Sequence, residues 1–483
     1  MKRQRISAVD TAWLRMDRPG NLMMICGVLI FREKIDLARL RHVIAERFLV
    51  FKRFRQRPVE TPAMSFWETD AHVDLEHHVA HTALPGRAGK RELQSLVSRL
   101  ASTPLDPARP RWQFHLVDNY RGGSAIVARI HHCYADGIAL VRVMLSMTDA
   151  TADGPPAMPF QARERRKARA NDTLSHLIAP LSGVLESARR IGGILVETGA
   201  GIWHDPAKAV ELADKGTALT AEIAKLALMA QDSPTRFKGV PGVTKRVAWA
   251  DPMPLPEVKA VGRALGSSVN DVLLCCAAGA LRDYLVARGS PVDGVVLRAL
   301  VPVNLRPVES AYRLGNQFGL VFLDLPIGIE NPIERLYAVR ANMNALKGSY
   351  QPILTLGLLA AMGSGPKILQ ETLLTILARN ATAVMTNVPG PRQALYLAGA
   401  RIDSLMFWVP QSGDIGMGVS ILSYDDRVQF GVVTDRGLCP DPERLIERFP
   451  AQFEQLVLAT LMSPWPRDGD LDPEVAAAAV RAG

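Results

Sequence analysis

Two adjacent histidines followed by an aspartate–glycine pair are the residues of this chain best placed to do chemistry. They lie in residues 131–137, His-His-Cys-Tyr-Ala-Asp-Gly. Residues 124–130 before them are mostly β-branched or apolar and predict a buried strand, and residues 138–147 after them predict a helix. Because neighbouring side chains on a strand point to opposite faces, only one histidine can face a given cavity. We therefore expect His131 and His132 to have different roles.

His132 is the candidate general base, and its neighbours are expected to shape the loop that carries it. A neutral imidazole, with an ordinary pKa of about 6.5, can take a proton from a hydroxyl group while that oxygen attacks a carbonyl carbon. Asp136 stands where the helix begins, so its carboxylate can cap backbone N–H groups or pair with an arginine elsewhere. Gly137 would permit a tight turn. His131 is expected to be a supporting neighbour.

Other interpretations of this stretch remain open. Both histidines could be hydrogen-bonded residues at a strand end with no catalytic role. A metal site is disfavoured, because adjacent histidines on a strand diverge and no third ligand stands in register, so we expect no metal. Cys133 could be a nucleophile, but nothing marks its thiol as activated, and we expect a small packed residue. The Asp-Gly pair at this offset favours the catalytic interpretation.

The composition is typical of a globular protein of the cytoplasm. With 483 residues, 48% of them hydrophobic and 22% charged, the chain predicts two folded domains rather than disorder. A net charge of +9 favours an anionic partner, such as cofactor phosphates or an anionic membrane surface, and no nucleic-acid motif appears. The five scattered cysteines predict reduced thiols. Neither a signal peptide nor a transmembrane run is evident, so we expect a cytoplasmic protein, with peripheral membrane contact left open.

The chain divides into four parts by its patterns. Residues 1–150 mix predicted strands and helices and carry the histidine stretch. Residues 151–240 are a connector, basic at its start and then apolar enough for two long helices. Residues 241–470 are a second domain of mixed strands and helices, and residues 471–483 are a peripheral tail. The mixture of periodicities predicts an α/β (α+β) fold.

Local patterns also predict the elements around the candidate residues. In the first domain we expect a helix over residues 10–16, a strand over 23–31, a helix over 36–51, and a hairpin of strands 112–117 and 125–130. In the second, Ser268 or Asn270 could cap a helix over residues 272–287. A short strand over residues 383–386 is expected to end at the turn Asn387-Val-Pro-Gly-Pro391, and further strands are expected over 405–410, 416–423 and 428–434.

The whole chain resembles a known family. His-His-x-x-x-Asp-Gly is similar to the motif of the CoA-dependent acyltransferase superfamily, which the condensation domains of nonribosomal peptide synthetases share. From end to end, the sequence resembles the bacterial wax ester synthase/diacylglycerol acyltransferase family. The matching blocks follow the family's order: residues 7–10, the Pro-Leu-Asp of 104–106, Asn270-Asp271, Gly315-Asn316 and the Asn-Val-Pro-Gly-Pro of 387–391. The chain departs from the family at Leu22 and Met24, where proline and histidine are common, and at Cys275.

This resemblance implies two chloramphenicol-acetyltransferase-like domains, joined by a helical linker, with an active-site tunnel between them. His132 would deprotonate the acceptor alcohol in a ternary complex with acyl-CoA, a co-substrate, and no permanently bound cofactor is implied. The tetrahedral oxyanion needs a hydrogen-bond donor. Asn270 is, by its place in the family's motif, the candidate for that donor or for orienting the site, with a helix cap as its other role. Asn387 and Asp106 would be structural.

The leading hypothesis is therefore transfer of a long-chain acyl group from acyl-CoA to a fatty alcohol or diacylglycerol, which makes wax esters or triacylglycerol. A condensation-type acyltransferase that uses carrier-bound acyl groups is the alternative enzyme. A non-catalytic protein of the lipid-inclusion surface is an alternative of another class. The expected partners are acyl-CoA, a lipid acceptor and a membrane or lipid-inclusion surface, not nucleic acid.

Overall fold

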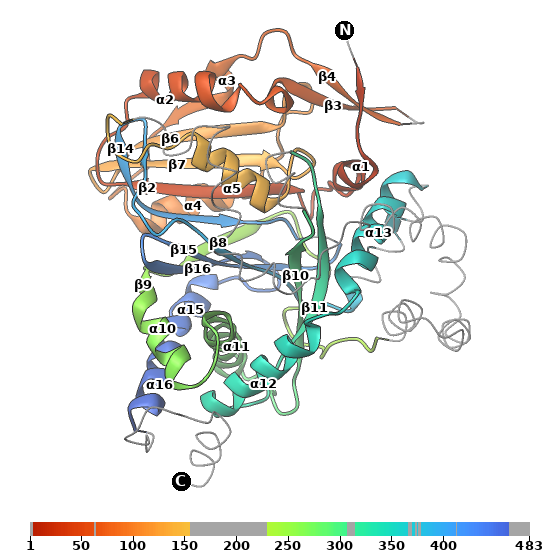
Figure 1. The fold of residues 1–483 in the computed structure, drawn as a ribbon, viewed down its shortest axis with the longest axis vertical. Coiled ribbons are helices and arrows are strands. Elements are labelled where there is room, and N and C mark those ends of the chain that lie inside the picture. Colours follow the sequence, from red (N-terminus) through yellow and green to blue (C-terminus); the bar gives the residue numbers. More distant parts are fainter. Residues whose placement is uncertain are drawn as a thin grey trace.

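The structure is a computed structural model that describes residues 3–61, 64–154, 229–306, 314–365, 370–371, 374, 378–411 and 413–462. Two large sheets lie one above the other, with helices between and around them (Figure 1). The basic start of the connector, the two long helices predicted within it and the tail at 471–483 lie outside the described residues.

The first large sheet is built mainly from the N-terminal part of the chain. Its strand order is β13-β14-β2-β7-β6-β5. These strands are β2 (Met24–Phe31), β5 (Val79–Thr82), β6 (Trp112–Tyr120), β7 (Gly123–His131), β13 (Tyr396–Leu397) and β14 (Ala400–Trp408). The predicted hairpin is confirmed, because β6 and β7 pair antiparallel around a tight turn in which Arg121 and Gly122 have positive φ. A small sheet of β1 (Gln4–Arg5), β4 (Ser65–Thr69) and β3 (Gln56–Glu60) lies beside it.

Strand β14 crosses from the second half of the chain into this first sheet. It pairs antiparallel with β2, and Leu405 lies opposite Leu29. The strand predicted near residues 405–410 is thus the end of a longer strand that begins at Ala400. The sheets therefore do not follow the sequence division at residues 1–150 and 241–470, because residues 396–408 extend the N-terminal sheet.

The second large sheet has the order β11-β10-β12-β15-β16-β8, with β9 also paired to β16. Its strands are β8 (Lys245–Trp249), β9 (Met253–Pro254), β10 (Leu297–Asn304), β11 (Phe318–Leu325), β12 (Ala383–Pro389), β15 (Met417–Tyr424) and β16 (Arg427–Asp435). The expectation that β12 ends before Asn387 is wrong, because its pairing with β15 continues to Pro389. Proline is tolerated there, since β10 pairs only with the first two residues of β12 and no ladder bond on that side is lost.

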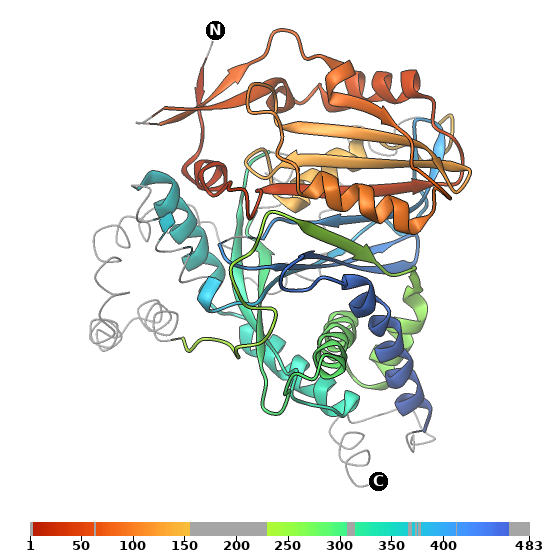
Figure 2. The same ribbon diagram turned by 180° about the vertical axis from the view of Figure 1, so that it is seen from behind.

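Helix α4 (Lys90–Ala101) joins the two halves. It lies between the upper sheet and β8 of the lower sheet (Figure 2). The hydroxyl of Ser98 accepts a hydrogen bond from the backbone N–H of Val247 at 2.9 Å, and the hydroxyl of Ser102, just past the helix, accepts one from Lys245 at 2.8 Å. Because β8 is an edge strand, these N–H groups would otherwise lack a strand partner.

The helices lie in both halves of the chain, and several of them begin at a capping side chain. The helices of the first half are α1 (Ala8–Arg15), α2 (Leu37–Val43), the π-helix η1 (Ile44–Phe48), the 3₁₀-helix η2 (Lys52–Arg55), α3 (Leu75–His78), α4 (Lys90–Ala101) and α5 (Gly137–Ser146). Those of the second half are α10 (Leu255–Ala264), α11 (Val269–Ala287), α12 (Pro332–Leu346), α13 (Gln351–Ser364), α15 (Pro442–Ile446) and α16 (Arg448–Met462). Ser268 caps α11, while Asn270 lies inside its first turn, so Asn270 is not the cap. The helix predicted over 36–51 continues past α2 as the π-helix η1 and ends at Phe48.

No single described helix is long and apolar enough to cross a membrane, although α10 and α11, bent by 99° at their junction, would pass that test when taken together.

Candidate active site

The histidine stretch forms a buried loop between β7 and α5. The backbone N–H of His132 donates to the carbonyl of Met23 at 2.7 Å, which fixes the loop to the start of β2. The hydroxyl of Tyr134 donates to the carbonyl of Gln56 at 2.6 Å and accepts from the N–H of Arg111 at 2.9 Å. Tyr134 is fully buried, so these bonds anchor the loop to the backbone of Gln56 and Arg111.

The His132 imidazole is covered by two aromatic side chains. Its ring is stacked on Trp13 of α1, with centroids 4.1 Å apart and planes 26° apart, and it lies 5.6 Å from the ring of Phe318 at the start of β11. Only 3% of His132 is exposed. Within the described residues the imidazole is therefore enclosed rather than lining an open tunnel, because both rings pack directly against it.

Burial keeps the His132 imidazole uncharged. It lowers the pKa of His132 to about 4, against the opposing effect of the Asp136 carboxylate. At neutral pH the side chain is therefore the neutral imidazole, which is the form that can accept a proton. His132 thus has the protonation state that a general base needs, and it lies beside the Trp13 ring.

Asn316 links His132 to a buried carboxylate. Its side-chain Nδ2 donates to the backbone carbonyl of His132 at 2.9 Å and to Oδ1 of Asp10 at 2.8 Å. Its backbone N–H also donates to Asp10, at 3.0 Å. Burial raises the pKa of Asp10, and the hydrogen bonds from Asn316 oppose this shift. Helix α1 and the segment before β11 thus meet at His132.

Asp136 holds the loop in both of the ways that its position predicted. As the cap of α5, its Oδ1 accepts from the backbone N–H of Ala139 at 2.8 Å. Its Oδ2 accepts from Arg306 at 2.6 Å and from the N–H of Gln317 at 3.1 Å. The Asp136–Arg306 ion pair is almost wholly buried, with side-chain exposures of 6% and 2%. It therefore ties the motif loop to the second half of the chain.

Gly137 differs from the expectation. It is the first residue of α5, and it is not among the described residues with positive φ. A Cβ at this position would meet only the Val409 side chain, at an ordinary 3.9 Å. The loop therefore does not need glycine here for a tight turn, because the backbone already has a conformation open to other residues.

His131 has partners different from those of His132, although the strand ends at His131 and His132 already lies in the loop. Its Nδ1 accepts from the N–H of Cys133 at 3.2 Å, and its Nε2 lies 3.5 Å from Oδ2 of Asp17. Burial lowers the pKa of His131, and Asp17 opposes the shift. Asp17 in turn accepts from the N–H of Met23 at 2.9 Å, so this pair supports the strand that binds the His132 backbone.

The remaining candidate site residues either have partners outside the motif loop or carry an unreactive side chain. Cys133 is fully buried, and burial raises its pKa well above the ordinary value, so the thiol is not activated. Asn270 accepts a hydrogen bond from Nδ2 of Asn387 at 2.7 Å, which joins α11 to β12. Asp106 accepts from the N–H of Ala108 at 2.8 Å and so stabilises its own loop. Among the described residues, no group of three histidine, cysteine or acidic side chains could hold a metal ion.

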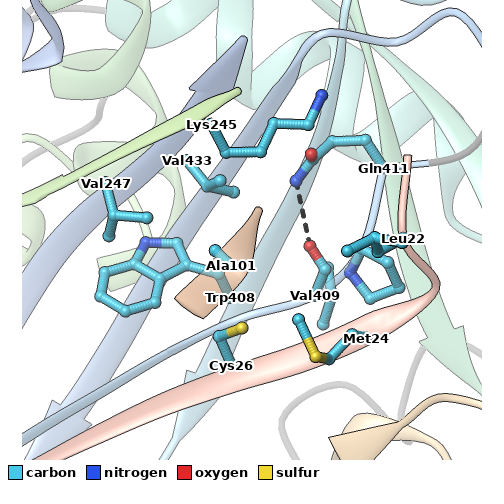
Figure 3. A pocket seen from close by; sticks show the side chains of 11 residues that line it. Leu22, Met24, Cys26, Ala101, Lys245, Val247, Trp408, Val409, Gln411 and Val433 are labelled. Atoms are coloured by element: carbon cyan, nitrogen blue, oxygen red, sulfur yellow. Dashed lines mark hydrogen bonds between the residues drawn. The ribbon is translucent and has the colours of Figure 1, made fainter. Parts of the chain in front are cut away.

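A small cavity lies between the sheets, next to the residues that flank Met23 (Figure 3). Its volume is about 20 Å³. One end is polar, with Lys245 and Gln411, and the walls are apolar side chains that include Met24 and Trp408. This volume suits about one water molecule, so an acyl chain cannot lie here unless side chains move.

The sequence did not reveal the residues that contact the motif loop from distant parts of the chain. Trp13, Asn316 and Arg306 all contact the motif loop or its histidine. Gly315-Asn316 was visible as a family block, but nothing local linked it to His132, which is 184 positions away. Arg306 gave no signal, since an isolated arginine has no periodic or motif context.

Comparison with known proteins identifies the chain. Residues 6–273 match the model of the wax ester synthase/diacylglycerol acyltransferase catalytic domain, and residues 314–457 match the WS/DGAT C-terminal domain. The chain belongs to the wax ester synthase/diacylglycerol acyltransferase family. As a WS/DGAT family member it is an acyltransferase, and this confirms the resemblance seen in its sequence.

Relatives of this WS/DGAT protein match along most of its length. A Mycobacterium bovis protein that carries the name diacylglycerol O-acyltransferase is 29% identical over 96% of this chain and 92% of its own. A Mycobacterium tuberculosis protein with the same name is 30% identical over 83% of this chain and 87% of its own.

Solved structures confirm the fold. The wax ester synthase/diacylglycerol acyltransferase of Marinobacter aquaeolei VT8 matches with a TM-score of 0.68 and 23% identity, over 95% of this chain and all of that one. The first condensation domain of the calcium-dependent antibiotic synthetase matches with a TM-score of 0.57 and 12% identity, over 95% of this chain and 97% of that one. The WS/DGAT chain therefore has the expected mixed α/β fold shared with condensation domains.

Proposed function

We propose that the protein moves a long-chain acyl group from acyl-CoA to the hydroxyl of a fatty alcohol or diacylglycerol, which makes a wax ester or triacylglycerol. The observation that carries this proposal is His132, a neutral buried imidazole held by its backbone and ring in a family whose members are acyltransferases. The names of the relatives support diacylglycerol as one acceptor.

The reaction proceeds in a ternary complex, without a covalent enzyme intermediate. His132 removes the proton of the acceptor hydroxyl while that oxygen attacks the thioester carbon. The carbonyl electrons move to the oxygen, and the tetrahedral intermediate collapses to the ester and CoA thiolate. The imidazolium then returns its proton to the leaving sulfur. Buried Asp136 stabilises the transient positive charge on the ring.

The other candidates serve the base rather than the substrate. His131 supports the loop through Asp17, and Asp136 fixes the loop through Arg306. Asn270 is proposed to orient the site from α11, since its Oδ1 is engaged by Asn387 and its Nδ2 is left to donate. No resident cofactor is part of this mechanism, in which acyl-CoA is a co-substrate.

The site of action is proposed to be the cytoplasmic face of the inner membrane or of lipid inclusions, where water-insoluble acceptors collect. The formal net charge of +9 suits both anionic lipid surfaces and the phosphates of CoA.

Purified protein incubated with palmitoyl-CoA and either hexadecanol or diacylglycerol tests this function. We expect release of free CoA together with wax ester or triacylglycerol in equal amounts. Acyl groups on a carrier protein form the comparison arm. Transfer from the carrier-bound donor with none from palmitoyl-CoA would replace the proposal with a condensation-type activity, and binding to lipid droplets without any ester would replace it with a surface role.

A further inference from the structure

Helix α1 presents two residues to the base from one face. Asp10 and Trp13 are three positions apart, so they lie on the same side of the helix. Asp10 reaches His132 through Asn316, whereas Trp13 touches the imidazole directly, with ring centroids 4.1 Å apart. Trp13 is 5% exposed, and its second aromatic neighbour is Phe318, at 5.8 Å.

The indole N–H of Trp13 has no hydrogen-bond partner among the described residues, although it is buried. A buried donor without an acceptor is unfavourable, and indole nitrogen can only donate. Nearby, Asn316 donates its Nδ2 to Asp10 and His132, while its Oδ1 acceptor is buried without a partner among the described residues and does not bind the indole. Within the described part of the chain, the Trp13 N–H is thus an unused donor on a ring that stacks on the His132 imidazole.

We propose that Trp13 is a catalytic residue whose indole N–H donates to the oxyanion of the tetrahedral intermediate. This inference rests on the proposed function in that it uses the same base and the same acyl transfer. The reacting carbon must lie within reach of a hydroxyl that is itself hydrogen-bonded to His132. A donor on a ring stacked against that imidazole is thus close to the oxygen where negative charge develops.

The step balances without a further reactant. The O–H bond of the acceptor breaks and its proton passes to His132, while a C–O bond forms to the thioester carbon. The carbonyl π electrons become the oxyanion lone pair, which accepts from the Trp13 N–H. On collapse the C=O bond forms again, the C–S bond breaks, and the proton on His132 passes to CoA sulfur.

Trp13 fits this role better than Asn270. Asn270 is paired with Asn387 at the junction of α11 and β12, whereas the Trp13 ring is in contact with the base itself. In addition, the Trp13 donor is on a rigid two-ring side chain, and α1 is packed so closely on α13 that a Cβ at Gly363 would lie 1.6 Å from the carbonyl oxygen of Ala8. The donor is thereby held in place before the reaction, as oxyanion stabilisation requires.

Trp13→Phe in the full-length protein tests the proposal, because phenylalanine keeps an aromatic ring beside His132 but removes the N–H. CoA release from palmitoyl-CoA is measured with the better acceptor and with water, since the oxyanion forms in either transfer. We expect kcat to fall by about 10²-fold with KM changed by less than about threefold, and the pH dependence of kcat to stay as in wild type. Asn270→Ala is assayed beside it, and we expect a smaller loss of kcat.

The matched control is Trp408→Phe, which also removes a buried indole N–H that has no partner among the described residues. Its ring lies 5.7 Å from that of Trp249, at a tilt of 47°, instead of against His132. We expect it to keep the wild-type kcat. If Trp13→Phe is unfolded by circular dichroism, a benzothienyl analogue of Trp13, with sulfur in place of N–H, replaces it. Wild-type kcat in a folded Trp13→Phe or analogue protein would overturn the proposal. A wild-type protein that releases CoA only to water would overturn the proposed acceptors and leave this test in force.

Discussion

The side-chain amide of Asn316 donates to the backbone carbonyl of His132 across 184 positions of sequence, at an N–O distance of 2.9 Å. The same amide donates to Asp10 at 2.8 Å. One side chain therefore connects helix α1, the motif loop and the segment before β11. His132 is positioned by both halves of the chain, and each half contributes residues that a local pattern would not reveal.

Replacing Asn316 is expected to displace the base. Asn316→Ala removes the donor to His132 and leaves the buried Asp10 carboxylate short of a partner. Because a shift of about 1 Å at a catalytic group can cost about 10²-fold in rate, we expect kcat to fall by about tenfold or more with little change in KM. Steady-state CoA release measures this.

Asn119→Ala is the control for that experiment. The Asn119 side chain also makes two hydrogen bonds, both to the backbone of Leu84, and neither residue is near the motif. We expect a loss of stability with kcat retained. Equal losses of kcat in the two variants would show that the Asn316 effect is general destabilisation.

Breaking the buried pair between Asp136 and Arg306 should cost much stability. Arg306→Met leaves a carboxylate that is 6% exposed without its cationic partner. Removal of one partner of a buried ion pair typically costs about 3–5 kcal/mol of unfolding free energy. Urea unfolding measures the loss. Arg18→Met, which breaks an exposed pair with Asp414, should cost less than about 1 kcal/mol, and a similar effect of both variants would contradict the importance of burial.

The rate of CoA release should stay constant at pH values well below about 6.5, the ordinary pKa of histidine. Because burial lowers the pKa of His132 to about 4, the base stays unprotonated as pH falls through 6.5. We expect kcat/KM for CoA release to be flat from pH 8 to about pH 5 and to fall only as pH approaches 4. An acid limb centred near pH 6.5 would show that His132 is not desolvated in the working enzyme.

The unfolding free energy should also depend on pH, and it should fall as the pH drops from 6.5 to about 4. Burial lowers the pKa of His115 to about 4, as it does for His132, so between pH 6.5 and pH 4 the unfolded chain binds protons that the folded chain does not. The unfolding free energy therefore decreases as pH falls through that window. His115→Gln should reduce the slope measured by urea unfolding at several pH values, and an unchanged slope would contradict the assignment.

The tight crossing of α1 and α13 should tolerate no added methyl group. Gly363→Ala would bring Cβ to 1.6 Å from the carbonyl oxygen of Ala8 and force the helices apart. We expect a loss of at least about 1–3 kcal/mol in unfolding free energy. Gly137→Ala, with its nearest contact at 3.9 Å, should unfold near the wild-type temperature although it lies in the motif. The opposite order of thermal stability would contradict this reading of the two glycines.

Local sequence patterns predicted local structure well and long-range contacts poorly. The strand, loop and helix around His132 follow from residue types within about 25 positions, and so does the hairpin of β6 and β7. The insertion of β14 beside β2 could not be predicted, because the pairing of strands nearly 380 positions apart gives no periodic pattern in the sequence. Trp13 and Arg306 were missed for the same reason, since only the folded chain brings them to the loop.

The central claim is that His132 is the general base of acyl transfer from CoA. Its most direct test is the turnover of His132→Ala with palmitoyl-CoA, beside His72→Ala, which removes an exposed imidazole outside the site. We predict that CoA release and ester formation are lost in His132→Ala, while circular dichroism and the unfolding midpoint show a folded protein, and that His72→Ala is unaffected. A folded His132→Ala protein that keeps most of the wild-type turnover would contradict the account.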